Sequence, residues 1–521
     1  MSAPLEAMPG APAARQKERV AAIDVGSNSV RLLVAEYDPA SGLEIIDEMR
    51  DTPRLARGVA LTGRLDPEAV ERAMGALRRA RDVLRRRGVT RVSAVATAAM
   101  REAVNGHEFV QRVRDELDIP LRIIDAETEA TLAWRSVAHH FPLAGQRTLV
   151  ADIGGGSLEL IGAVDGLVEL TTSLPLGAVR LTELHLSGRK DTWGEIEQLR
   201  KVVRRQLKQG FAARKWRSAL VIGSGGSFTS LARMAIARRG LLIPDSVHGE
   251  PVSTAEVEQL LEWVVTLSPE KRREVAGLNP DRADIILAGL AVTAELLQLV
   301  DARSMTVSGF GLREGLLLEM VGAAELRKAD PLRLMREFVE KCQGDQRHVE
   351  HVRLLCRQLL EQLGPALGCE PDDAPLLEAA ALLHDVGQVV SYRKHHKHSH
   401  QLILHADRLG LAARERTLVA VISRYHRRGG PSRKHAEFAA LSDRDQQVVR
   451  RLAALLRLAD GLDRGHVGLV ERVSTELKPA VLTVTAHGRP GADLALECWS
   501  AERKSDVLAD LLARDVVVLG R

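Results

Sequence analysis

Short apolar runs alternate with one long arginine-rich stretch near the start of the chain. The runs at 20–25, 30–37, 91–97 and 121–125 are rich in aliphatic residues, which is typical of buried strands. Residues 67–87 look helical, and their six arginines from Arg78 to Arg87 predict a solvated helix face. Strand-like runs return at 148–154, 158–164, 219–228 and 304–311. Strands interleaved with helices predict an α/β fold.

One pattern occurs twice, once in each set of runs. In "AIDVGSNSVRL" (22–32) and "ADIGGGSLEL" (151–160), Asp24 matches Asp152, Gly26 matches Gly154 and Ser29 matches Ser157. Two α/β halves that open with the same hairpin predict a duplicated fold.

The rest of the chain is helical and then mixed. From Asp330 to about Arg464, Leu and Ala recur at helical spacing with few β-branched runs, which predicts an all-α domain. After residue 465, "ERVSTEL", "AVLTVTA" and "LALECW" alternate like strands before a helical end, which predicts a small α+β module. The expected organisation is a disordered start at 1–16, α/β halves at 17–145 and 146–325, a helical domain at 330–464 and a C-terminal module at 465–521.

Composition indicates a multidomain globular protein. The 521 residues are 45% hydrophobic, but no apolar run approaches the roughly 20 residues of a membrane span, and the N-terminus lacks the apolar stretch of a secretory signal. We therefore expect a cytoplasmic protein with neither a membrane nor a nucleic-acid partner.

Positive charge is concentrated in one segment. Residues 391–435 hold eleven Lys or Arg, two acids and seven His, although the net charge of the chain is only +4. This basic tract is either a solvated surface or a groove that holds a long polyanion, and its histidines lead us to favour the groove. The expected groove residues are Arg393, Lys394, Lys397, Arg427 and Arg428.

The repeated turn suits phosphate. In each copy an Asp ends a buried strand, and the residues after it offer backbone N–H groups and hydroxyls to an anion. Two such turns in matching halves would face each other across a cleft and hold one phosphorylated ligand. A third turn, "GSGGSF" (223–228), would cover the far side of that ligand. The expected phosphate-binding residues are Asp24, Gly26, Ser27, Asn28, Ser29, Gly154, Gly155, Gly156, Ser157, Gly225 and Gly226.

Acidic residues distinguish the second turn from the first. Where the first copy has Arg31, the second has Glu159, so Asp152 and Glu159 stand on the two arms of one hairpin. Two carboxylates would repel a phosphorylated substrate unless a hard cation lay between them, and we expect Mg²⁺, with Mn²⁺ as the alternative. A further acid pair, Glu127 and Glu129, follows the run at 121–125. These acids either begin a helix, or one of them orients or deprotonates a water for in-line attack.

Together these motifs resemble the exopolyphosphatase/guanosine pentaphosphate phosphohydrolase (Ppx/GppA) family. Eight motifs over about residues 18–325 stand in the order that they have in the family: "DVGSNSVRL", "TAAMREAVNG", "AETEATL", "DIGGGSLEL", "LPLGAVRL", "GSGGSF", "RADIILAG" and "VSGFGLREGLLL". The resemblance implies a duplicated actin/Hsp70/sugar-kinase fold with ribonuclease H-like halves. It also implies turns that hold the terminal phosphates of polyphosphate or guanosine pentaphosphate, and a homodimer formed through the C-terminal half.

The resemblance also implies roles for individual residues. Glu129 would be the base that activates water, and Asp152 and Glu159 would bind or organise Mg²⁺. Arg101 of "TAAMRE" would grip a phosphate, since a guanidinium can bind two oxygens at once. Thr128 and Ala126 stand where the family has an acid and a glycine, which leaves Glu127 as an alternative base.

A second resemblance covers the helical domain. "AALLHDVGQVV", "HHKHSHQLI", "RYHRRG" and "LLRLADGLDR" look like the HD-like domain of the longer family members. An HD metal site needs a helix His, an adjacent His-Asp pair and a distant Asp. The resemblance implies that this domain generally lacks established metal chemistry, so we favour a structural or polyanion-binding role over a second metal site. The candidates are His351 or His348, then His384, Asp385 and Asp460, with His398, His400 and His426 as extras.

Three functions remain open. The leading one is a metal-dependent exopolyphosphatase that releases orthophosphate from the end of polyphosphate. The second removes the 5′ γ-phosphate of guanosine pentaphosphate, and the third is a phosphotransferase or a polyphosphate-binding regulator. Glu129 without an evident second-substrate pocket favours hydrolysis, because water needs a base but no binding site of its own.

Overall fold

The computed structural model describes residues 17–39, 42–143, 145–186, 193–322, 331–406, 409–427 and 429–521. These residues form two compact units. The first unit holds the described residues up to Ala235 and from Pro251 to Gly322, and the second holds Ile236–Glu250 and the described residues from 331 onward. The disorder expected for 1–16 lies outside the described residues.

A five-stranded sheet organises the first half of the first unit. Its strands stand in the order β3-β2-β1-β4-β5, with the first two pairings antiparallel and the last two parallel. The strands are β1 (Glu18–Val25), β2 (Val30–Asp38), β3 (Gly42–Asp51), β4 (Arg91–Ala96) and β5 (Leu121–Ile123). The helices are α1 (Val59–Thr62), α2 (Pro67–Arg87), α3 (Ala98–Glu102) and α4 (Gly106–Leu117). The arginine-rich helix expected at 67–87 is confirmed as α2.

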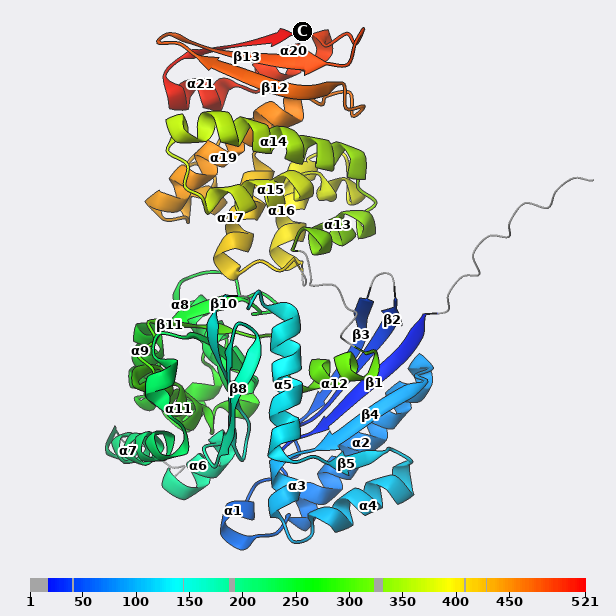
Figure 1. Ribbon diagram of the computed structural model, residues 1–521, viewed down its shortest axis with the longest axis vertical. Helices are drawn as coiled ribbons and strands as arrows, with labels where there is room; N and C mark the ends of the chain where they lie inside the picture. The colour runs from blue at the N-terminus through cyan, green and yellow to red at the C-terminus, as the bar shows by residue number, and fades with distance from the viewer. Residues whose placement is uncertain are drawn as a thin grey trace, which may run out of the picture. The chain divides into compact units, whose positions relative to one another are not determined.

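A six-stranded sheet repeats this plan in the second half (Figure 1). Its order β8-β7-β6-β9-β11 matches β3-β2-β1-β4-β5 strand for strand, and β10 adds an edge. The expected duplicated, actin-like α/β fold is confirmed by this match. The strands are β6 (Arg147–Ile153), β7 (Leu158–Val164), β8 (Leu167–Leu174), β9 (Leu220–Ser224), β10 (Glu250–Ser253) and β11 (Ser304–Val307). The helices are α6 (Ala178–His185), α7 (Trp193–Gly210), α8 (Gly226–Arg238), α9 (Thr254–Val265), α10 (Pro269–Arg273) and α11 (Ile286–Leu299).

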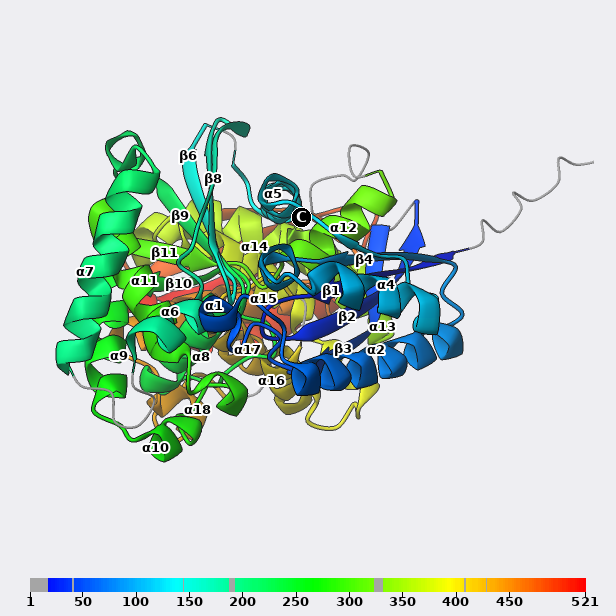
Figure 2. The same ribbon diagram turned by 90° about the horizontal axis from the view of Figure 1, so that it is seen from below.

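Two helices join the halves. α5 (Ala126–His140) lies between the two sheets in both views (Figures 1 and 2). Its Ala130 and Val137 are buried with residues of β6, β7 and β9, and its Leu132 is buried with β1, β2 and α12 (Leu312–Met320). α12 crosses α5 so closely that a Cβ on Gly315 would lie 2.1 Å from the Leu132 carbonyl oxygen. α12 thus packs on the first sheet, although the boundary we expected from the sequence assigned it to the second half.

The second unit combines helices with a three-stranded sheet around one core. Buried residues of α14, α15, α17 and α19 belong to the same hydrophobic cluster as Val470, Leu482 and Val516 of the sheet. The helices are α13 (Pro331–Lys341), α14 (Gln346–Leu367), α15 (Asp373–Leu383), α16 (His395–His405), α17 (Ala413–Arg424), α18 (Ala436–Ala439), α19 (Asp443–Gly461), α20 (Ala495–Arg503) and α21 (Asp506–Leu512). The strands are β12 (Val470–Leu477), β13 (Val481–Gly488) and β14 (Asp515–Gly520), in the order β12-β13-β14.

One predicted strand is wrong. Of the segment "LALECW" (494–499), Leu494 is the N-cap of α20 and the other five residues lie in that helix, not in a strand. Asp493 accepts a hydrogen bond from the Ala495 N–H at 2.9 Å and so favours a helix start, and the buried Glu497, Ser500 and Ala501 follow helical spacing. The apparent alternation of the segment spans too few residues to separate a strand from a helix.

The deeply buried helix α11 is a core helix of the first unit. α11 has twelve consecutive buried residues, from Ile286 to Leu297. Its 14 residues are fewer than the roughly 20 that a bilayer requires. Across the described ranges, no helix is both long enough and apolar enough to span a membrane.

Candidate active site

The two repeated turns have the same geometry. The Gly26 N–H donates to the Ser29 carbonyl at 3.0 Å, and the Gly154 N–H donates to the Ser157 carbonyl at 2.9 Å. The strand register places Asp24 opposite Arg31 in one hairpin, and Asp152 opposite Glu159 in the other. Residues directly opposite in an antiparallel pair share one face, so each turn presents a pair of ionisable groups on one side.

The turns approach each other closely. A Cβ on Gly155 would lie 2.6 Å from the Ser27 Cβ, and a Cβ on Gly156 would lie 2.9 Å from the Ala98 Cβ. Real side chains do not tolerate such distances, so glycine at these positions permits the approach. The sequence expectation that the two turns face each other agrees with this contact.

The carbonyl oxygens of both turns accept hydrogen bonds from backbone N–H groups elsewhere in the chain. The Ala56 N–H donates to Ser27 O at 2.7 Å, and the Val179 N–H donates to Gly155 O at 3.0 Å. Among the described residues, by contrast, the amide N–H groups of Ser27, Asn28, Gly155 and Gly156 have no hydrogen-bond acceptor. The turns therefore present donors rather than acceptors, as an anion requires.

Asp152 and Glu159 are held in place by serine hydroxyls. Ser224 Oγ donates to Asp152 Oδ2 at 3.2 Å, and Ser173 Oγ donates to Glu159 Oε1 at 2.9 Å. Burial raises the pKa of both carboxyls, that of Glu159 to about 7, and the Asp152 charge adds to the rise at Glu159. Gly225 leaves room beside this pair, since a Cβ there would lie 2.7 Å from Asp152 Oδ1.

Asp24 adds a third carboxyl on the side of the first turn. Burial raises its pKa to about 6, and the Arg31 charge opposes that rise. Its Oδ1 is buried and has no hydrogen-bond partner among the described residues. Arg31 donates from Nε to Ser29 Oγ at 3.1 Å, and burial lowers its own pKa to about 10.

The acid pair on α5 splits into one inward and one outward residue. Asp125 caps the helix by accepting from the Thr128 N–H, which fixes the direction of its first turn. Glu129 then points inward and pairs with Arg101 of α3 at 2.7 Å, with 15% of its side chain exposed. Glu127 is exposed to solvent.

The environment of Glu129 favours its protonated form. Burial raises its pKa well above 4.5, the nearby Glu159 charge adds to the rise, and Arg101 opposes it. Arg101 is also anchored by donating to the Ile124 carbonyl at 2.9 Å. Three sequence-predicted residues, Glu129, Arg101 and Glu159, are thus brought together beside the turns, and Glu127 is not.

Sequence reasoning missed several residues around the site. Arg282 donates to Ser227 Oγ at 3.0 Å behind the third turn, and burial lowers its pKa to about 9. Gly226 permits this contact, since a Cβ there would lie 2.3 Å from Arg282 Nη1. The charge of Arg313 reaches both Asp24 and Arg31. Both arginines stand in motifs that carried the family resemblance, "RADIILAG" and "VSGFGLREGLLL", and these motifs were the only sequence signal for them.

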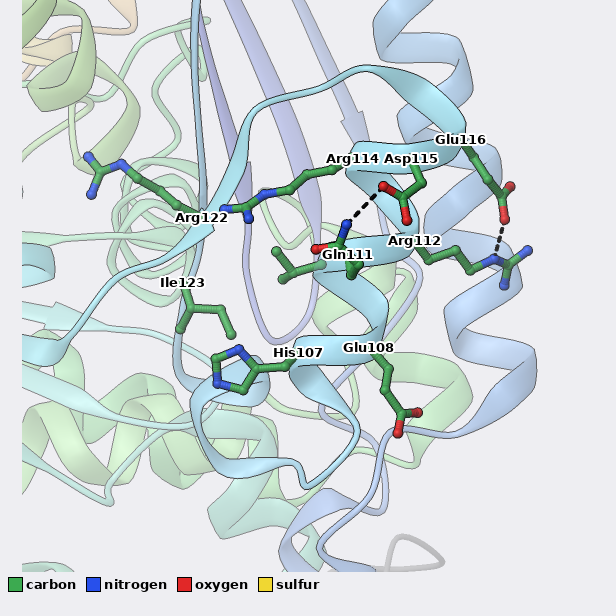
Figure 3. A pocket seen from close by; sticks show the side chains of 10 residues that line it. His107, Glu108, Gln111, Arg112, Arg114, Asp115, Glu116, Arg122 and Ile123 are labelled. Carbon is green, nitrogen blue, oxygen red and sulfur yellow. Dashed lines mark hydrogen bonds and ion pairs between the residues drawn. The ribbon is translucent and has the colours of Figure 1, made fainter.

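A surface pocket of about 880 Å³ lies elsewhere in the first unit, along α4 and β5 (Figure 3). Its polar side chains largely satisfy one another: Gln111 pairs with Asp115, and Arg112 pairs with Glu116. None of the predicted site residues lines this pocket.

The predicted HD-like residues gather within the second unit, with one difference. His384, Asp385 and Asp460 lie together, but their helix partner is His348 and not His351. The two histidines stand three residues apart on α14, so their side chains lie about 60° apart around the helix axis. His351 lies instead beside Gly468. Of the possible extras, His426 joins the cluster, whereas His398 and His400 are not among its candidate ligands in the described residues.

The basic tract separates into an exposed and a buried part. Arg393, Lys394 and Lys397 are exposed, Arg427 lies partly buried over the Tyr392 ring at 5.2 Å, and Arg428 lies outside the described residues. Most of the tract histidines do not line a surface, because four of the seven are buried: His395, His396, His400 and His426. The polyanion groove stays a prediction, and its main support is the exposed cations rather than the histidines.

Comparison with known proteins places the chain in a family. The Ppx/GppA phosphatase family model matches residues 33–324, and the model for Ppx/GppA phosphatase domain III matches residues 332–486. The guanosine-5′-triphosphate,3′-diphosphate pyrophosphatase of Vibrio vulnificus is 30% identical over 474 residues, which is 90% of each chain. The structure of the Aquifex aeolicus Ppx/GppA family member is 30% identical with a TM-score of 0.51, and covers 60% of this chain and 100% of its own. An exopolyphosphatase structure from Cytophaga hutchinsonii is 25% identical with a TM-score of 0.55, and the shares covered are again 60% and 100%. The chain therefore belongs to the Ppx/GppA phosphatase family.

Proposed function

We propose that this phosphatase hydrolyses the terminal phosphoanhydride bond of inorganic polyphosphate and releases orthophosphate. The supporting observation is the grouping of Glu129, Arg101 and Glu159 next to two turns that present free amide N–H groups. A terminal phosphate needs donors around its oxygens, and water needs a base.

The chain's own residues divide the work of the reaction. The amides of the two turns and the Arg101 guanidinium bind oxygens of the terminal phosphate and oppose its charge. Glu129 accepts a proton from the water whose oxygen forms the new P–O bond, while the bridging P–O bond breaks and its electron pair leaves with the shortened chain. Arg101 pairs with Glu129, so it also favours the ionised form that a base requires.

Asp152 and Glu159 fit a divalent cation. Glu159 is buried and Asp152 is half-buried on the same hairpin face, and Asp24 Oδ1 adds an oxygen without a described partner. An all-oxygen donor set of this kind suits Mg²⁺, and Mn²⁺ is the alternative. Bound there, the cation would supply charge neutralisation for the phosphate oxygens.

Guanosine pentaphosphate is the second candidate substrate. The Vibrio vulnificus relative, whose name carries that activity, aligns with 90% of the chain, including the C-terminal unit. Both substrates end in the same phosphoanhydride, so the terminal-phosphate site described above would serve either. A phosphotransferase or a noncatalytic polyphosphate-binding regulator remains as a further alternative.

One assay separates these candidates. Phosphate release is measured side by side from long polyphosphate, short polyphosphate and guanosine pentaphosphate with Mg²⁺, with and without a nucleoside diphosphate. A polyphosphatase has its highest kcat/KM on polyphosphate, and a pentaphosphate hydrolase has it on the nucleotide. Formation of nucleoside triphosphate would indicate a transferase, and binding without turnover would indicate a regulator.

A further inference from the structure

Helix α6 contacts parts of the site that come from both halves of the first unit. It belongs to the second half, where Ala178, Val179 and Leu181 are buried and hold it in place. It also lies beside α1 of the first half, in both views (Figures 1 and 2). The proposed function uses none of its side chains.

The start of α6 holds the second turn. The Ala178 N–H donates to the Gly154 carbonyl, and the Arg180 N–H donates to the Gly155 carbonyl, both at 3.0 Å. The first N–H groups of a helix have no acceptor within it, so α6 can supply them to the turn. The carbonyls of the turn are thereby fixed against the helix, and the N–H groups of the turn are left for a ligand.

Glu183 connects the same helix to the first turn. Its Oε1 accepts from the Gly58 N–H at 2.8 Å. Gly58 ends a strap, residues 54–58, whose N–H groups donate to the carbonyls of Ser27 and Asn28 at 2.7 and 3.0 Å. Glu183 thus ties α6 to the segment that orients the first turn.

Arg180 connects α6 to the helix that carries Arg101. Its Nη2 donates to Glu102 Oε2 at 2.9 Å, and Glu102 is the last residue of α3. Arg101 directly precedes Glu102 and pairs with Glu129 at 2.7 Å. One helix therefore contacts both turns and the helix of the arginine that we expect to bind the terminal phosphate.

The exposure of the Arg180–Glu102 pair suits positioning rather than stability. The two side chains are 21% and 39% exposed, and ion pairs close to solvent contribute little to the free energy of unfolding. A displacement of about 1 Å in a positioned site, by contrast, costs about 10²-fold in rate. Loss of this pair should therefore reduce activity far more than stability.

We propose that Arg180 and Glu183 are positioning residues, which hold the two turns and Arg101 in the arrangement that fits one phosphate. Glu183 acts through the strap, and Arg180 acts through α3. This inference rests on the proposed function, because the arrangement matters only if the turns and Arg101 bind the terminal phosphate.

The first test measures phosphate release by the full-length protein. Arg180→Gln should lower kcat/KM by about 10–10²-fold, with a melting temperature near that of the wild type. Arg180→Lys keeps a charged donor for Glu102 and should retain more activity. The matched control is Arg78→Gln, which breaks a pair with Glu116 at 3.2 Å between side chains that are 44% and 41% exposed, and should leave kcat/KM unchanged.

A double-mutant cycle shows the group through which Arg180 acts. In an Arg101→Ala protein, adding Arg180→Gln should cost no further activity, because the guanidinium that it positions is already absent. A residue that only stabilises the fold would cost the same factor in both backgrounds. At the other contact, Glu183→Gln keeps an acceptor for the Gly58 N–H and should retain more activity than Glu183→Ala.

Binding separates this inference from the proposed function. Tripolyphosphate binding with Mg²⁺ is measured by calorimetry, which requires no turnover. Arg180→Gln and Glu183→Ala should weaken it roughly tenfold, because the binding groups are less preorganised. If the wild type binds tripolyphosphate but hydrolyses no polyphosphate, the proposed function fails and the binding comparison still decides this inference.

Three results would overturn the inference. The first is wild-type kcat/KM and wild-type affinity in the folded Arg180→Gln and Glu183→Ala proteins. The second is an equal loss in Arg78→Gln and Arg180→Gln. The third is a wild-type protein that neither binds tripolyphosphate nor hydrolyses polyphosphate, which would reject the proposed function as well.

Discussion

Gly155→Ala is the sharpest test of the paired turns. Carbon atoms in contact are about 3.5–4.0 Å apart, whereas the new Cβ would lie 2.6 Å from the Ser27 Cβ, so the turns must separate by roughly 1 Å. A displacement of this size in a positioned site costs about 10²-fold in rate. We therefore expect kcat/KM for phosphate release to fall by about 10²-fold in the folded variant.

The neighbouring glycine supplies a matched control. In Gly154→Ala the new Cβ would lie 3.5 Å from the Ser157 carbonyl, an ordinary contact, so activity should stay near that of the wild type. Ser27→Gly removes the clashing atom, so the Ser27→Gly/Gly155→Ala pair should lose less activity than the product of the single losses. Wild-type kcat/KM in a folded Gly155→Ala protein, or an equal loss in Gly154→Ala, would refute the reasoning.

Three further outcomes are expected. Glu129→Gln should lower kcat by about 10²–10⁴-fold while polyphosphate binding persists, and Glu127→Gln should stay near normal; the reverse would make the exposed acid the base. The base acts as a carboxylate and the pKa of Glu129 is raised, so kcat/KM should fall as the pH drops through a value above 4.5. Added Mg²⁺ favours ionised carboxylates and should shift this fall to lower pH. A fall at or below pH 4.5 that does not change with Mg²⁺ would contradict the assignment of Glu129 as the base. Neutralising the exposed tract cations should slow hydrolysis of long polyphosphate and spare short chains, because only long chains reach both surfaces; equal losses on both lengths would exclude this effect. The tract variants are Arg393→Gln, Lys394→Gln and Lys397→Gln, and the charge-matched controls on α2 are Arg78→Gln, Arg85→Gln and Arg86→Gln.

Local patterns predicted the two hairpins well. In each copy seven positions separate the Asp from its opposite residue, and a short turn between two apolar runs leaves one natural register. The sequence therefore placed Asp152 and Glu159 on opposing arms, and the duplicated turn implied the duplicated sheet order.

The sequence did not predict which side chain of a pair on one helix faces inward. Glu127 and Glu129 are two residues apart on α5 and so point in nearly opposite directions, and only the packing of α5 decides which one faces inward. His348 and His351 lie only about 60° apart around the axis of α14, and here too the packing of the helix decides which one joins the cluster. In both cases the residue types were predicted correctly, and the choice within each pair depended on tertiary contacts.

Contacts between distant segments were beyond the sequence. Arg282 reaches Ser227 across 55 positions, and Ser224 reaches Asp152 across 72. No periodicity connects such pairs, because their proximity follows from strand order and helix packing.

The return of α12 to the first sheet affects how the chain is made. Leu316 and Leu317 complete the apolar cluster that contains Val20, Leu33 and Val95. A ribosome synthesises the strands of this sheet early, but it must continue past residue 317 before that cluster can close. The first sheet therefore lacks part of its apolar cluster while nearly 200 further residues are synthesised. The second half can finish folding before the first.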